Sequence, residues 1–266
     1  RIELAPALGL LLLAATVPLH NAASTPGREL QEMIEAAIAS GDRHLRIPPG
    51  DYLFNTTHAN LEVHGADNLT IDAAGVTVWL WPGAFVDVRN SEQSTIRDLT
   101  VDYSPPCFSQ GSVAAVHSAN HSFELVVESG FLPPDIQLHP QFNATEVKLI
   151  YWSAATRLML QQPGANPWDP TRSACAGLRC TITLGDRMNP LPVVGDLVTV
   201  SPRIGANMVI QTWYTSGYRH TNCSEMSVVN ITMHGSGSMG FGEFGGEGGN
   251  TYTDCRNIRR PGSSQL

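Results

Sequence analysis

A five-residue phrase that occurs three times constrains the fold more than any other feature of this chain. Its copies are Asn68–Asp72 (NLTID), Asp98–Asp102 (DLTVD) and Asn230–His234 (NITMH). Each copy has an apolar residue on either side of a threonine, which is the alternation of a β-strand with one buried face. A returning strand phrase predicts stacked coils of one β-solenoid, and the 30 residues from Leu69 to Leu99 lie within the range of solenoid repeats. The alternative is three ordinary strands that share a dipeptide.

The composition fits a turn-rich β protein. The chain has 266 residues, of which 42% are hydrophobic and 15% charged, and it contains 24 glycines and 18 prolines. Its net charge of −8 argues against binding to nucleic acid backbones or anionic membranes. Because the chain opens on Arg1 without a methionine and stops shortly after Arg260-Pro261-Gly262, we interpret it as a fragment.

The first residues predict export from the cell. Residues 1–23 have the pattern of a signal peptide: an apolar run from Leu8 to Val17 behind one arginine, then small residues around Ala22. The run is too short for a membrane span, so none is expected in the mature chain. We predict a secreted, extracellular glycoprotein with glycans on Asn55, Asn120, Asn143 and Asn222; two further Asn-x-Thr sites, at Asn68 and Asn230, lie inside the strand phrase.

Five cysteines agree with an oxidising compartment. Cys175 and Cys180 close a short loop and are the predicted disulfide. Cys223 and Cys255 are expected at equivalent strand starts, stacked on neighbouring coils, and Cys107 is left without a partner. No Cys-x-x-Cys or His-Glu-x-x-His pattern is present, so neither a metal site nor a cofactor is expected.

The pattern of apolar residues divides the chain into four parts. After the signal peptide, residues 24–110 contain an amphipathic helix from Leu30 to Ile38, stopped by Gly41, and then strand phrases. Residues 111–205 lose the phrase and show a hairpin and Pro-rich loops, which predicts an inserted small β-barrel or sandwich. The phrase resumes in residues 206–266, the predicted continuation of the solenoid.

Three segments resemble a known family. The helix followed by Ile47–Tyr52 (IPPGDY) looks like the capped start of right-handed parallel β-helix proteins of the pectin lyase superfamily. Leu99–Gly111 and Met233–Gly240 resemble the α-1,3-galactosidase family of glycoside hydrolases. The resemblance implies an all-β, right-handed parallel β-helix with an N-terminal capping helix, an inserted small β-barrel, and activity on terminal α-galactosides. The catalytic aspartates of that family map beyond Leu266.

Within the chain, several residues are candidates for a glycan site. Hydrolysis of a glycosidic bond uses two carboxylates, and the candidates are Asp102, Glu243 and Glu247. Gln110, Trp79 and Trp81 are candidate substrate-binding residues, the tryptophans because indole rings stack on sugars. We expect the turns bearing Asp102 and Glu243 to meet on neighbouring coils. The alternative roles are a turn cap for Asp102, solvated loop positions for the glutamates and core packing for the tryptophans.

Two other interpretations are disfavoured. Gly240–Gly245 matches the dinucleotide-binding pattern Gly-x-Gly-x-x-Gly, but no helical pattern follows it. The signatures of pectin-cleaving enzymes are absent from the chain. Two classes remain: a secreted glycoside hydrolase, and a non-catalytic β-helix protein that binds glycans at a surface or in a matrix.

Overall fold

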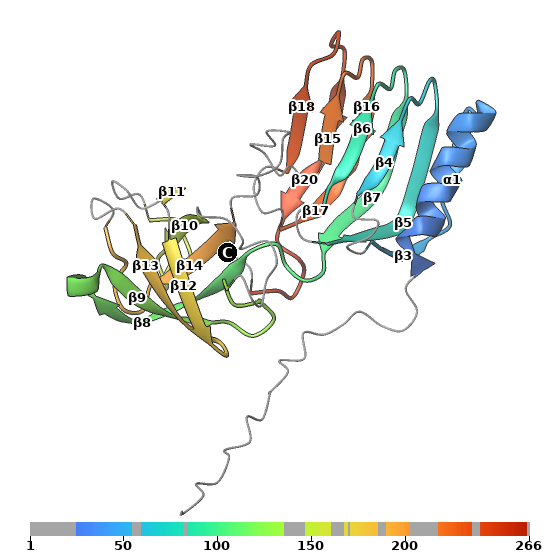
Figure 1. The fold of residues 1–266 in the computed structure, drawn as a ribbon. Coiled ribbons are helices and arrows are strands. Elements are labelled where there is room, and N and C mark those ends of the chain that lie inside the picture. The colour runs from blue at the N-terminus through green and yellow to red at the C-terminus, as the bar shows by residue number, and fades with distance from the viewer. Residues whose placement is uncertain are drawn as a thin grey trace, which may run out of the picture.

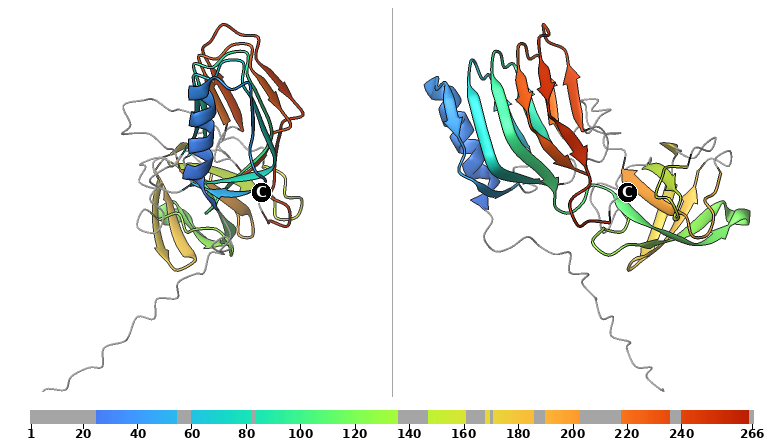
Figure 2. Two further views of the ribbon diagram at one scale, coloured as in Figure 1. Left: turned by 90° about the vertical axis from the view of Figure 1, so that its right-hand side faces the viewer. Right: turned by 180° about the vertical axis from the view of Figure 1, so that it is seen from behind.

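The protein is a parallel β-solenoid with one helix at its start and an inserted antiparallel sheet (Figure 1). The computed structural model describes residues 25–54, 60–81, 84–135, 147–160, 168–169, 171–185, 190–202, 218–235 and 240–264. The predicted signal peptide lies outside these residues. The inserted sheet lies outside the stack of coils, on the side away from the helix (Figures 1 and 2).

Helix α1 spans Gly27–Ser40 and forms as the sequence predicts. Leu30, Ile34 and Ala37 recur at helical spacing and are buried against the first coil. The helix ends at Gly41, whose φ of 70° lies in the left-handed region that glycine adopts at low cost. Gln31 on α1 contacts the backbone of residue 62 in the next strand, accepting from its N–H and donating to its C=O. α1 therefore takes the place of a preceding strand.

The larger sheet of the solenoid is built from parallel strands along the whole stack. In the described residues these strands are β1 (Thr25–Pro26), β2 (His44–Arg46), β3 (Gly50–Leu53), β5 (Thr70–Leu80), β7 (Thr95–Tyr103), β16 (Ser227–Val229), β17 (Thr232–His234), β19 (Thr251–Thr253) and β20 (Arg256–Ile258). Thr100 on β7 pairs with Thr232 on β17, so the second and third copies of the phrase lie side by side despite the insertion between them. The solenoid prediction is confirmed.

The register differs from the predicted one. Thr70 pairs with Thr95, and Leu99 pairs with Val76, so neighbouring coils are offset by 25 residues here and not by the 30 that the phrase indicated. Asn68 and Asp98 both have positive φ, but Asn68 stands at the corner before the first strand of its coil, whereas Asp98 bends the chain between two strands. Both corners need the same local sequence, an Asn or Asp followed by an alternating strand, so one phrase marks two different positions.

The smaller sheet closes the other side of the coils. Its strands are β4 (Leu61–His64), β6 (Val86–Arg89), β15 (Tyr218–Thr221) and β18 (Phe241–Phe244), all parallel. Alternate residues point inward, as Val63 and Val88 do, and meet inward residues of the larger sheet such as Val101 in one core. Each such buried aliphatic side chain contributes about 1.5–3 kcal/mol of transfer free energy.

The insertion is a separate antiparallel sheet with strand order β11-β10-β14-β8-β9-β13-β12. Its strands are β8 (Ser109–His117), β9 (Ser122–Val127), β10 (Val147–Trp152), β11 (Trp168–Asp169), β12 (Thr171–Ala176), β13 (Arg179–Leu184) and β14 (Leu197–Pro202), with a 3₁₀ turn, η1, at Ser118–Asn120. The predicted hairpin is β8 and β9. Among the described strands β11 and β12 do not pair with each other, so the predicted barrel is here an open path of paired strands.

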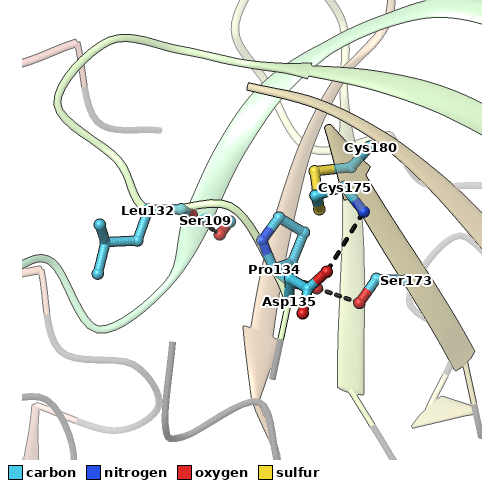
Figure 3. Close-up of a disulfide and its surroundings, with 7 residues drawn as sticks. All are labelled: Ser109, Leu132, Pro134, Asp135, Ser173, Cys175 and Cys180. Atoms are coloured by element: carbon cyan, nitrogen blue, oxygen red, sulfur yellow. Dashed lines mark hydrogen bonds between the residues drawn. A yellow bond between two sulfur atoms is a disulfide. The ribbon is translucent and has the colours of Figure 1, made fainter. Parts of the chain in front are cut away.

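One disulfide lies in the insertion. Cys175 and Cys180 are bonded across β12 and β13, with Cα atoms 4.0 Å apart, as Figure 3 shows. The Asp135 carboxylate accepts a hydrogen bond from the Cys175 N–H at 3.3 Å, and the Ser173 hydroxyl donates to the Pro134 carbonyl, so residues 134–135 are tied to β12 (Figure 3).

The other cysteines are free thiols. Cys223 follows the corner between β15 and β16, whereas Cys255 lies between β19 and β20, so the expectation that they stack is wrong. Cys107 is buried and its Sγ donates to the Gly235 carbonyl at 3.0 Å. Burial raises the pKa of Cys107 to about 12, which keeps it a thiol at neutral pH.

Candidate functional site

Asp102 lies at the end of β7, where the chain leaves the solenoid for the insertion. Its side chain is 2% exposed, and both carboxylate oxygens accept hydrogen bonds from the Arg260 guanidinium at 2.7 Å. The N–H of Tyr103 donates a third bond to Oδ1 at 2.7 Å, and Arg260 also donates to the Tyr103 carbonyl at 2.8 Å. A bidentate pair with this many donors satisfies Asp102 within the protein, which fits a structural ion pair better than a catalytic acid.

Trp79 lies beside this ion pair. It is in register with Asp102, its indole N–H donates to Asp51 at 3.1 Å, and the Arg260 guanidinium lies 5.2 Å from the centre of its ring. The side chain is buried, so a sugar cannot stack on the ring as the sequence analysis suggested. Trp81 follows the end of β5 and is partly exposed.

Gln110 is near Asp102 through a shared segment. It is buried on β8, and its amide nitrogen donates to Glu128 Oε2 at 2.5 Å and to the Ser264 carbonyl at 2.8 Å. Residues 260–264 therefore bind both Asp102 and Gln110, and this contact fastens the last described residues to the start of the insertion. We call Asp102, Arg260, Trp79 and Gln110 the junction cluster.

The two candidate glutamates lie elsewhere. Glu243 belongs to β18 in the smaller sheet, in register with His220, and accepts a hydrogen bond from the Asn250 amide at 2.7 Å. Glu247 is exposed in the turn after β18. The structure thus groups Asp102 with Gln110 and Trp79, and it places Glu243 and Glu247 in another sheet and its turn, so the expected cluster with Asp102 is not assembled.

His220, the neighbour of Glu243 in the smaller sheet, is fully buried between two tyrosines. Tyr218 Oη lies 3.3 Å from its Nε2 and Tyr252 Oη lies 3.2 Å from its Nδ1. Burial lowers the pKa of His220 to about 4, with a smaller opposing effect from Glu243. His220 is therefore neutral at neutral pH and serves the interior of the solenoid.

A second group of polar side chains, which sequence reasoning missed, covers the outer face of the smaller sheet. Glu62, Asp87 and Arg219 are paired in register across β4, β6 and β15, and His64 and Arg89 form the next pair. We call these five residues the outer row. The signal in the sequence is a polar residue on each side of a buried valine in Leu61–His64 and again 25 residues later in Val86–Arg89.

Asp87 is the buried centre of the outer row. It is 1% exposed; its Oδ2 lies 2.5 Å from Arg89 Nη2 and 3.6 Å from His64 Nε2, while His64 Nδ1 lies 3.9 Å from Glu62 Oε2. The interaction with Asp87 raises the pKa of Arg89. Neither Asp87 oxygen receives a well-aligned hydrogen bond from the described residues. His64 thus lies between a buried and a half-exposed carboxylate.

Arg219 extends the outer row with aromatic side chains. Its guanidinium lies 5.5 Å from the centre of the Phe85 ring and 5.2 Å from that of Phe244, and its Nε donates to Thr221 Oγ1 at 3.1 Å. All three flanking side chains come from neighbouring coils of one sheet. A cation held between two rings forms a flat surface with apolar and hydrogen-bonding parts.

The predicted glycosylation sites fall into two groups. Asn120 and Asn222 are exposed at turns, whereas Asn55 and Asn143 lie outside the described residues. Asn68 and Asn230 are also exposed, both with positive φ, and the Asn230 amide donates to Asp98 at 2.7 Å. Attachment of glycans at any of them remains a prediction.

Other kinds of site were considered in the same residues. The described part of the chain holds no group of three His, Cys, Asp or Glu side chains placed to bind a metal ion. In it, the segment from Gly240 continues as strand β18 and then a turn into β19, not as the helix that a dinucleotide site requires. No described helix combines the length and hydrophobicity needed to cross a membrane.

Comparison with known proteins adds no identity. No family model matches the chain, and no curated protein matches it. The resemblance to the α-1,3-galactosidase family therefore remains a prediction from the sequence, while the parallel β-solenoid that it implied is present.

Proposed function

We propose that this is a secreted carbohydrate-active β-solenoid protein, a glycoside hydrolase acting on terminal sugars of the α-galactoside type. The observation that carries the proposal is the outer face of the smaller sheet, where parallel register aligns Glu62, Asp87 and Arg219 on successive coils. Sugars combine apolar C–H faces with many hydroxyls, so they bind to surfaces that combine aromatic rings with charged hydrogen-bonding groups.

Hydrolysis requires two carboxylates near the scissile bond. Glu62 and Asp87 are the in-register pair of outward carboxylates on neighbouring coils, whereas Asp102 is occupied by Arg260. This comparison favours the outer row over the junction cluster as the place where a glycan would be bound. The alternative is that the scaffold binds a glycan without cleaving it, which Phe85, Arg219 and Phe244 could support alone.

The test uses the full chain. Release of p-nitrophenol from p-nitrophenyl α-galactoside, and of galactose from α-galactosyl oligosaccharides, should be measured beside binding to an immobilised glycan panel. Turnover supports the hydrolase, and binding without turnover supports the binding alternative. If no neutral glycan is bound or cleaved, the proposed function is wrong.

A further inference from the structure

A groove runs along the seam between helix α1 and strand β4. Its lining side chains are Gln31, Glu35, Ile38, Ala39, Glu62 and His64, and its volume is about 180 Å³. Sites for drug-sized ligands are roughly 300–1,000 Å³, so this groove has room for a single small ring and not for an extended chain. It borders the outer row, because Glu62 and His64 belong to both.

The polar groups that face the groove are mainly hydrogen-bond acceptors. Glu35 and Glu62 present carboxylates, and the Glu62 side chain is 46% exposed with only the distant His64 ring beside it. The Gln31 amide is already used, because it binds the backbone of residue 62 and donates to Glu35 at 3.0 Å. A ligand in this groove must therefore supply donors.

Asp87 sets the orientation of His64 from behind the groove. The buried carboxylate lies 3.6 Å from His64 Nε2, and its negative charge favours the tautomer with the proton on Nε2. The Nδ1 atom, on the side of Glu62, is then an acceptor as well. The lack of an aligned hydrogen bond to either Asp87 oxygen leaves this carboxylate free to hold the ring.

The opposite wall of the groove is apolar, formed by Ile38 and Ala39 on α1. A pyranose ring has the matching chemistry: hydroxyls that donate at its edge and C–H groups on its face. An anionic sugar does not match, because its carboxylate would face Glu35 and Glu62 at short range.

We propose that the groove between α1 and β4 binds one neutral hexose, with Glu35, Glu62 and His64 accepting hydrogen bonds from its hydroxyls and Ile38 packing against its ring. This subsite rests on the proposed function and extends it, since it assigns the sugar class and the residues that select it. It separates neutral hexoses from uronic acids by charge and needs no metal or cofactor.

The experiment measures binding of methyl α-galactopyranoside to the full chain by calorimetry, with galacturonic acid as the anionic comparison. Loss of one charged acceptor should weaken binding by about tenfold or more, so we expect this for Glu62→Gln and for His64→Ala. The matched control is Glu32→Gln, which removes an exposed carboxylate on the same helix that pairs with Arg28, and it should change the affinity less than twofold. Galacturonic acid should not bind measurably.

The outcomes separate the subsite from the function. If methyl α-galactopyranoside binds and Glu62→Gln, His64→Ala and Glu35→Gln all bind as the wild type does, the subsite is overturned while the function stands. Tight binding of galacturonic acid also overturns it. If neither this sugar nor the glycan panel binds, both proposals fail. Because Glu35 is on the exposed side of α1, its variant keeps the test valid should His64→Ala not fold.

Discussion

Asp102 and Arg260 lie 158 residues apart in the chain, yet the guanidinium of Arg260 donates two hydrogen bonds of 2.7 Å to the Asp102 carboxylate. The pair joins the strand that precedes the insertion to the last described residues. Arg260 also lies against the ring of Trp79, which fixes its side chain from a third direction. The pair therefore closes the solenoid at the place where the chain interrupts it.

Removal of Arg260 should destabilise the protein. Arg260→Met leaves the buried Asp102 carboxylate without its counter-charge, and loss of one partner from a buried pair typically costs about 3–5 kcal/mol. Because Arg260 is about one-third exposed, we expect the lower end of this range, measured as the free energy of unfolding in denaturant. Arg28→Met, which breaks an exposed helical pair, should cost less than about 1 kcal/mol.

Asp102→Asn distinguishes the structural role from a catalytic one. If the ion pair is structural, this variant loses stability, and the double variant with Arg260→Met loses less than the sum of the two single changes. A variant with unchanged stability and greatly reduced turnover would instead return Asp102 to the catalytic candidates.

The solenoid and the insertion could be predicted because their signals are local. The alternation in Leu99–Val101 and the helical spacing of Leu30 and Ile34 depend only on neighbouring residues, and both elements formed. The register could not be predicted in the same way. Asn68 and Asp98 share a left-handed backbone and a similar sequence, and only the pairing of distant strands tells their two corners apart.

The candidate site was harder to predict than the fold. The pair of Asp102 with Arg260 depends on where a loop returns after the insertion, which no local pattern encodes. Glu62 and Asp87 became neighbours only once the coil offset of 25 residues was known. Strand β15 was missed because its inward positions hold Tyr218 and His220, which break the aliphatic pattern of β6.

The disulfide should make a modest contribution to stability. Cys175 and Cys180 are five residues apart, and closing so short a loop removes little entropy from the unfolded chain, worth about 2 kcal/mol. Cys175→Ser/Cys180→Ser should lower the free energy of unfolding by this amount. Reductant should bring the wild type to the same level and leave the double variant unchanged. A wild type that does not respond to reductant, although its thiols become alkylated, would contradict the expectation.

Gly111 should tolerate no side chain. It lies on β8, and a Cβ added there would overlap the backbone carbonyl of Val126 on β9, which cannot move without breaking the strand pairing. Gly111→Ala should therefore lower the free energy of unfolding by roughly 1–3 kcal/mol, measured by denaturation. Ser112→Ala, at the exposed neighbouring position, is the control and should be near neutral. Equal stability of the two variants would show that the strands separate without cost.

His220 should make the stability depend on pH in a defined window. Burial lowers its pKa from the usual 6.5 to about 4, so in the unfolded chain it takes up a proton at a higher pH than in the folded protein. Its contribution is therefore complete above pH 6.5 and is lost as the pH falls toward 4. The shift corresponds to about 3 kcal/mol of unfolding free energy.

The measurement compares the wild type with His220→Gln, which keeps hydrogen-bonding groups beside Tyr218 and Tyr252 but does not titrate. Carboxylates elsewhere titrate equally in both proteins, so they cancel in the difference. The stability advantage of the wild type should be constant above pH 7 and should shrink by about 3 kcal/mol by pH 4. A difference that does not change with pH would mean that His220 titrates at the same pH in the folded and unfolded chain, and hence that water or the Glu243 charge reaches its ring.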